Sequence, residues 1–147
     1  MQLRRTLLAV SLGLVVLPAA ACDIAVPTPG ILALSSNGQS LSSSNPGGLA
    51  TVIVISSLSI LSSTTITISN TRLDQTPGGF NGPVGYAASY TAVWALGSAS
   101  GSLTNNPSFT VPPVLNLAVT ITLHNSVTTT TGFRQGNYTT KTSVTCT

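Results

Sequence analysis

The sequence predicts an all-β protein, built as an antiparallel β-sandwich of about seven strands. Three observations support this fold class. Short segments rich in Val, Ile, Leu and Thr recur along the chain, and several alternate apolar and polar residues as half-buried strands do. Turn signals rich in Gly and Pro separate these segments. No segment has the apolar spacing of an amphipathic helix, so two sheets are expected to pack against each other.

The N-terminus has the three parts of a secretory signal peptide. Arg4 and Arg5 form a positive start, and residues 7–17 (LLAVSLGLVVL) form an apolar run of about 11 residues, too short to span a bilayer. Three alanines at residues 19–21 suit a signal peptidase. We therefore expect residues 1–21 to be a signal peptide and residues 22–147 to be a single exported domain in the periplasm, at the cell surface or outside the cell.

The first half of this domain contains four strand patterns. Residues 24–26 form a short strand that ends at two nearby prolines, and residues 31–34 (ILAL) form another. Residues 50–55 (ATVIVI) are a continuous apolar run, which predicts a central strand buried on both faces. Residues 64–69 (TTITIS) alternate, which predicts one buried and one exposed face.

The second half contains longer patterns. Residues 84–96 (VGYAASYTAVWAL) and 108–111 are expected strands, and residues 114–124 (VLNLAVTITLH) are the clearest case because every second residue is apolar. Residues 138–146 (YTTKTSVTC) form a closing strand. The segments between these strands are rich in turn residues and predict loops at residues 35–48, 76–83, 97–107 and 132–137.

Few charges remain once the signal peptide is removed. The whole chain has a formal net charge of +3, and without Arg4 and Arg5 this falls to about +1. The remaining cations are scattered along the sequence, whereas a nucleic-acid surface needs clustered Lys and Arg. We therefore expect no nucleic-acid partner.

The residues that enzymes use are nearly absent. The chain has one His and two acidic residues, both Asp, at positions 23 and 74. Their spacing indicates neither a pair of catalytic carboxylates nor a metal site. His124 falls on the polar face of its predicted strand, which favours a solvent-facing role over a catalytic one. We expect a protein that is not an enzyme and holds no metal or cofactor.

Three aromatic residues share one face of the strand predicted over residues 84–96. Tyr86, Tyr90 and Trp94 could form an exposed platform that stacks on sugars or on a partner. The alternative is that they fill the sandwich core together with Val84 and Leu96, which have the same parity.

The surface composition indicates assembly. The domain is rich in Ser and Thr, and uncharged strands without Pro, such as residues 51–55 (TVIVI), pair readily with other chains when an edge is exposed. A protein with little net charge is also poorly protected from association. These features favour a structural or adhesive role over that of a free monomer.

The C-terminal segment carries a family resemblance. Residues 132–146 (GFRQGNYTTKTSVTC) resemble the closing strand of bacterial spore-coat-U-like and related fimbrial, pilin-type subunits, and the N-terminal order of signal peptide, Cys and short strand is similar in kind. The resemblance implies an immunoglobulin-like sandwich that exchanges strands with other subunits, usually with a chaperone and an outer-membrane usher. In that family an extension ahead of the first cysteine donates the strand, whereas cleavage after residue 21 leaves none ahead of Cys22.

These observations define two functional expectations. The first is a non-catalytic, pilin-like structural or adhesive protein at the bacterial cell surface. It would assemble with itself or with other pilin-like subunits. The second is a periplasmic or surface module that binds a glycan or a small ligand.

The two cysteines leave three alternatives open. Cys22 and Cys146 lie at opposite ends of the domain, and a sandwich can bring such ends together in a disulfide. Alternatively, the small residues 19–21 precede Cys22 as a lipobox would, and a lipid on Cys22 would anchor the protein to a membrane. Two unpaired thiols are the third alternative.

Overall fold

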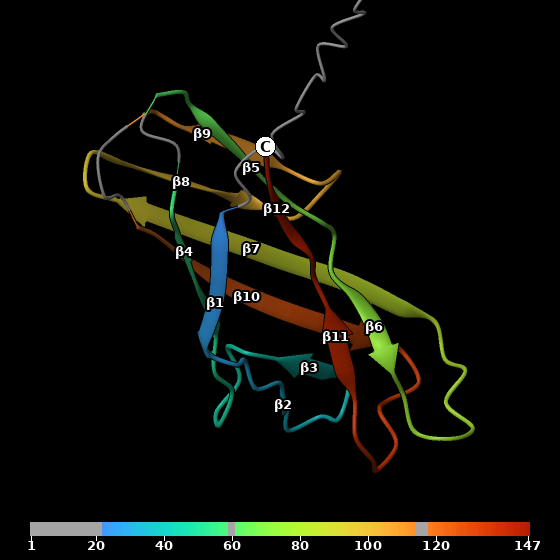
Figure 1. Cartoon of the computed structure of the whole chain (residues 1–147). Helices are drawn as coiled ribbons and strands as arrows, with labels where there is room; N and C mark the ends of the chain where they lie inside the picture. The colour runs from blue at the N-terminus through green and yellow to red at the C-terminus, as the bar shows by residue number, and fades with distance from the viewer. Residues whose placement is uncertain (1–21, 59–60, 114–117) are drawn as a thin grey trace, which may run out of the picture.

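The computed structural model describes residues 22–58, 61–113 and 118–147 (Figure 1). The predicted signal peptide, residues 1–21, lies outside them. Every regular element within the described residues is a β-strand, and all the strand pairs are antiparallel. The all-β prediction and the sandwich-like arrangement are therefore confirmed.

Twelve strand segments follow one another along the described chain. They are β1 Asp23–Thr28, β2 Ala33–Leu34, β3 Ser40–Ser42, β4 Thr51–Ser56, β5 Thr64–Ile68, β6 Arg72–Gln75, β7 Val84–Trp94, β8 Gly97–Ser102, β9 Ser108–Val111, β10 Val119–Thr129, β11 Thr139–Lys141 and β12 Val144–Cys146. The expected number of about seven is too low. Several predicted strands are interrupted, and some segments without an apolar pattern are strands as well.

The larger sheet is built around β10, which is paired along both of its edges. One edge pairs with β7 over most of its length. The other edge pairs first with β4 and then with β3, so two short strands share it. Outside these lie β1 next to β4, β2 next to β3, and β8 next to β7. The long alternating pattern of β10 therefore organises the sheet.

The second layer consists of two interrupted strands that lie side by side. β5 and β6 are separated by residues 69–71, and they pair with β12 and β11, which are separated by residues 142–143. β9 adds to the free edge of β5. Figure 1 shows this layer crossing over β7 and β10.

The core lies between the two layers. It contains alternate residues of β4, β5 and β10, including Ile53, Ile55, Ile66, Ile68 and Ile121. The alternation predicted for β5 and for the first half of β10 is therefore confirmed. Residues 114–117 of that prediction lie outside the described residues, and β10 continues past His124 to Thr129.

Three sequence predictions about strands are wrong. Gly97–Ser102 was expected to be a loop and is the edge strand β8, because the regular partner β7 sets its register. Ser40–Ser42 lies within the loop expected at residues 35–48 and is strand β3, because it pairs with β10 and β2. Residues 50–55 were expected to be buried on both faces, but only the inner residues are fully buried while Val52 and Val54 are partly exposed.

Candidate functional site

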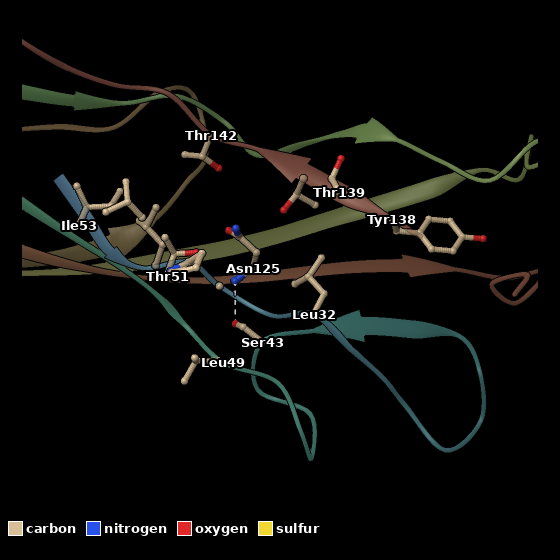
Figure 2. Close-up of a pocket in the computed structure, with 14 residues that line it drawn as sticks. Leu32, Ser43, Leu49, Thr51, Ile53, Asn125, Tyr138, Thr139 and Thr142 are labelled. Atoms are coloured by element: carbon tan, nitrogen blue, oxygen red, sulfur yellow. Dashed lines mark hydrogen bonds between the residues drawn. The ribbon is translucent and has the colours of Figure 1, made fainter. Parts of the chain in front are cut away.

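A groove opens between the two layers on the side where β1 and β11 lie. Its floor is the inner face of β4 and β10, one wall is β1 with the segment that follows it, and the other wall is β11. The cavity has a volume of about 350 Å³. Figure 2 shows Thr51 and Ile53 on one side of it, Thr139 and Thr142 on the other, and Asn125 between them.

The apolar part of the groove is an incompletely covered portion of the core. Ile24 of β1 lies directly opposite Ile55 of β4, so the two side chains point to the same, inner face of the sheet. Ile55 is fully buried, yet Ile24 is 44 % exposed and Val26, two residues along β1, is 51 % exposed. Two aliphatic side chains of β1 thus meet solvent, Ile24 opposite the buried Ile55 and Val26 on the lining of the groove.

Both walls of the groove end in free sheet edges. Among the described residues β1 pairs only with β4, β11 only with β6 and β12 only with β5. The outer backbone N–H and C=O groups of these strands therefore have no strand partner. Such edges accept an additional strand through main-chain hydrogen bonds.

A disulfide joins the β1 wall of the groove to β12, the strand that follows β11. Cys22 and Cys146 are bonded, with a Cα–Cα distance of 6.2 Å, and they connect the start of β1 to the end of β12. The two chain segments meet near the C-terminus in Figure 1. The predicted disulfide is confirmed, and a lipid attached through the Cys22 sulfur is incompatible with this bond.

One end of the groove is polar. Asn125 of β10 is 9 % exposed, and its Oδ1 accepts a hydrogen bond from Thr71 Oγ1 at 3.0 Å. Its backbone N–H donates to Ser43 Oγ at 3.1 Å, the dashed line in Figure 2. Its backbone carbonyl accepts the N–H of Ser43 at 3.0 Å. The hydroxyl of Thr71 is also 2.7 Å from the hydroxyl of Thr142, the residue directly after β11.

The three aromatic residues proposed as a ligand platform are placed differently from one another. Tyr90 is 6 % exposed and belongs to the core, where its ring stacks on Phe109. Trp94 stacks on the same Phe109 and is partly buried against the core. Only Tyr86 is exposed, and its hydroxyl accepts the N–H of Leu73. The structure therefore does not bring the three rings together as one exposed surface.

The residues considered for catalysis are dispersed. His124 is exposed on the outer face of β10. Asp23 lies on β1 and accepts a hydrogen bond from Ser57 Oγ at 2.6 Å, whereas Asp74 lies on β6 of the other layer. Within the described part of the chain no three His, Cys, Asp or Glu side chains gather as a metal site, and no helix there is long and apolar enough to cross a membrane.

Neither Asn125 nor the groove was predicted from the sequence. Asn125 has the same parity as Val119, Ile121 and Leu123, and all six inner residues of β10 are buried. A polar residue on the apolar parity of a long strand was the available signal. It was missed because the predicted strand ended at His124.

Comparison with protein-family models, with curated proteins and with solved structures found no match to this chain. The fold, the disulfide and the groove are therefore the observations that bear on its function.

Proposed function

We propose that this protein is a non-catalytic structural or adhesive subunit at the bacterial cell surface, similar to a pilin subunit, whose groove accepts an extended strand from another subunit. The observation that carries the proposal is the half-exposed inner face of β1. Ile24 lies opposite the buried Ile55 and Val26 lines the groove, yet about half of each side chain meets water. Covering such aliphatic surface is the main driving force for association.

The chemistry of the groove suits an uncharged strand. Its lining is a mixture of aliphatic side chains with Ser, Thr, Asn and Tyr, and none of the lining residues is charged. The free edges of β1 and β11 can provide main-chain hydrogen bonds to a strand lying between them. A strand with alternating side chains would place every second residue into the cavity.

Export fits the same proposal. A disulfide persists in oxidising compartments, and a groove for a strand from another subunit is useful to a protein that assembles outside the cytoplasm. We propose that the partner is a second copy or another pilin-like subunit, delivered with a chaperone and an usher. Membrane attachment through Cys22 is not part of the proposal because its sulfur lies in the disulfide.

The test uses residues 22–147 produced with the disulfide formed. A display library of peptides about nine residues long, uncharged and with varied inward positions, is selected against the protein. We expect enriched peptides, and we expect NMR signals of β1 and β11 amides to shift and gain protection from hydrogen exchange when one binds. Sedimentation velocity over a range of concentrations measures self-association of the same sample.

Two variants of β1 test whether peptide binding and self-association take place in the groove. Val26→Asp places a charge inside the groove, whereas Ala25→Asp places the same charge on the exposed outward face of the same strand. We expect Val26→Asp to abolish peptide binding and any self-association, and Ala25→Asp to leave both unchanged. The proposal is wrong if the protein stays monomeric at high concentration and enriches no peptide beyond the Val26→Asp control.

A small-ligand module is a second candidate because the cavity is within the size range of small-molecule sites, about 300–1,000 Å³. In that case a glycan panel would shift the NMR signals of Asn125 and Thr142 at the polar end of the groove. Trp94 fluorescence would not respond, since this ring packs against the core. Peptide binding without any glycan response would leave the strand-accepting function as the single explanation.

A further inference from the structure

The inner face of β10 changes from apolar to polar at Asn125. Val119, Ile121 and Leu123 precede it and belong to the apolar core, while Asn125 hydrogen-bonds to a network of hydroxyl groups. Leu123 and Asn125 both line the groove. The groove therefore has an apolar section and a polar section at neighbouring inward positions of one strand.

The hydrogen bonds around Asn125 fix the orientation of its amide group. Thr71 Oγ1 donates its single hydrogen to Asn125 Oδ1, so the 2.7 Å contact between Thr71 and Thr142 requires the Thr142 hydroxyl to be the donor. The chain of donors runs from Thr142 to Thr71 to Asn125. With the carbonyl oxygen held in this way, the NH₂ group is the part of the amide left for the cavity.

That NH₂ group has no hydrogen-bond partner among the residues that the structure describes. Asn125 as a residue is about nine-tenths buried, but its Nδ2 is not among the fully buried unpaired side-chain atoms of the described residues, so this nitrogen reaches solvent. A water molecule can satisfy it while the groove is empty. An occupant that displaces the water must then supply an acceptor of its own, or binding is weakened by the lost hydrogen bond.

We propose that Asn125 selects the strand that enters the groove. This inference rests on the proposed function. The preferred strand is uncharged, places aliphatic side chains over Ile53 and Leu123, and places one hydrogen-bond acceptor over Asn125. The side chains of Ser, Thr, Asn and Gln provide such an acceptor. Thr71 is a positioning residue because it holds the amide in the orientation that directs its donors into the groove.

The experiment repeats the peptide selection with matched baits. The peptides have Thr at outward positions and draw each inward position from Val, Ile, Leu, Ala, Ser, Thr, Asn, Asp and Lys. With the wild-type protein we expect aliphatic residues at most inward positions and an uncharged acceptor at one fixed position. Replacing that acceptor by Val in an enriched peptide is expected to weaken binding by about tenfold.

Two substitutions of Asn125 change the preference in different directions. Asn125→Leu removes the donor, and the preference for an acceptor should be replaced by a preference for an aliphatic residue. Asn125→Asp has nearly the same shape but only accepts hydrogen bonds when ionised, so the preference should move to donors such as Lys. Asn125→Asp keeps an oxygen that accepts the hydrogen bond from Thr71. This variant alone can test the preference if Asn125→Leu does not fold.

Two controls separate specificity from folding. His124→Leu alters the exposed outer face of the same strand and should leave the peptide preference unchanged. Thr71→Val removes the hydroxyl that orients the amide without entering the groove lining, and it should weaken the preference while peptides still bind. Thermal unfolding of each variant confirms that it is folded.

The outcomes distinguish the two proposals. If no bait enriches peptides, the proposed strand-accepting function fails. If peptides bind but wild type and both Asn125 variants select the same inward residues, the selection role of Asn125 is wrong and the strand-accepting function stands. If the preferred inward residue of the peptides changes with the residue at position 125, both the strand-accepting function and the selection role of Asn125 are supported.

Discussion

Gly48 packs closely against the backbone of the loop beside the groove, in a space too small for a side chain. A Cβ atom at this position would lie 2.6 Å from the backbone oxygen of Ser42 and 2.7 Å from that of Ser43. Ser43 in turn exchanges backbone and side-chain hydrogen bonds with Asn125. The packing of Gly48 therefore supports the polar end of the groove.

We expect Gly48→Ala to lower the free energy of unfolding by about 1–3 kcal/mol, because the loop must move away from an added methyl group. The control is Gly78→Ala, where an added Cβ would have no atom within 4 Å. Urea unfolding of both variants measures the difference. Equal stabilities for Gly48→Ala and wild type would show that the loop rearranges freely.

The indole N–H of Trp94 is a buried donor that is expected to reduce stability, because it has no hydrogen-bond partner among the described residues. Its Nε1 is buried and has no hydrogen-bond partner in the described structure, although the ring itself stacks on Phe109. Trp94→Phe removes the unpaired donor and retains an aromatic ring. We expect its free energy of unfolding to stay within about 1 kcal/mol of wild type, while Trp94→Ala loses about 2 kcal/mol or more. A Trp94→Phe loss as large as that of Trp94→Ala would mean that the indole N–H is satisfied.

At the scale of elements, the pairing of β6 with β11 brings two like charges together. Arg72 and Lys141 lie directly opposite each other, and both are exposed. Like charges in this position are destabilising, whereas opposite charges stabilise a strand pair by about 0.2–1 kcal/mol.

We expect Lys141→Glu to raise the free energy of unfolding by a few tenths of a kcal/mol, because Arg72 gains a partner of opposite charge. The gain should shrink at high salt, which screens exposed charges. Arg134→Glu makes the same change in net charge at an exposed residue outside the strands and is the control. The same effect for both variants would attribute the change to net charge alone.

The strands that could be predicted from sequence are those whose residues alternate strongly. The patterns of β5 and of the first half of β10 predicted both the strand and its buried face, because one face of each packs into the core. β8 and β6 could not be predicted in this way. β8 contains only Gly, Ala and Ser, and β6 is mostly polar, so their pairing with β7 and β11 determines that they are strands.

At the scale of the whole molecule, the disulfide was predictable and the groove was not. Two cysteines in a predicted exported domain suggest a bond between them. The groove depends on how β1 and β11, more than a hundred residues apart in the sequence, end as neighbouring unpaired edges. No local pattern contains that information. The half-exposure of Ile24 and Val26 is likewise visible only when the layers are assembled.

The disulfide holds the start of β1 next to the end of β12. Among the described residues β1 is held by pairing with β4 alone, and β12 by pairing with β5 alone, so the Cys22–Cys146 bond is a direct cross-link between the two layers beside the groove. Its sequence separation is 124 residues. In the chain-entropy model a loop of this length stabilises the fold by up to about 4–5 kcal/mol, because the bond restricts the unfolded chain.

We therefore expect the double variant Cys22→Ser, Cys146→Ser to lose about 2–5 kcal/mol of unfolding free energy, and β1 to exchange its amide hydrogens faster, because only β4 then holds it. Urea unfolding and hydrogen exchange measure the two effects. Wild type treated with reductant is the control and should match the double variant. Its intact mass should rise by about 2 Da on reduction. If the reduced protein is as stable as the oxidised one, the bond does not constrain the sandwich, and the groove is held open by strand pairing alone.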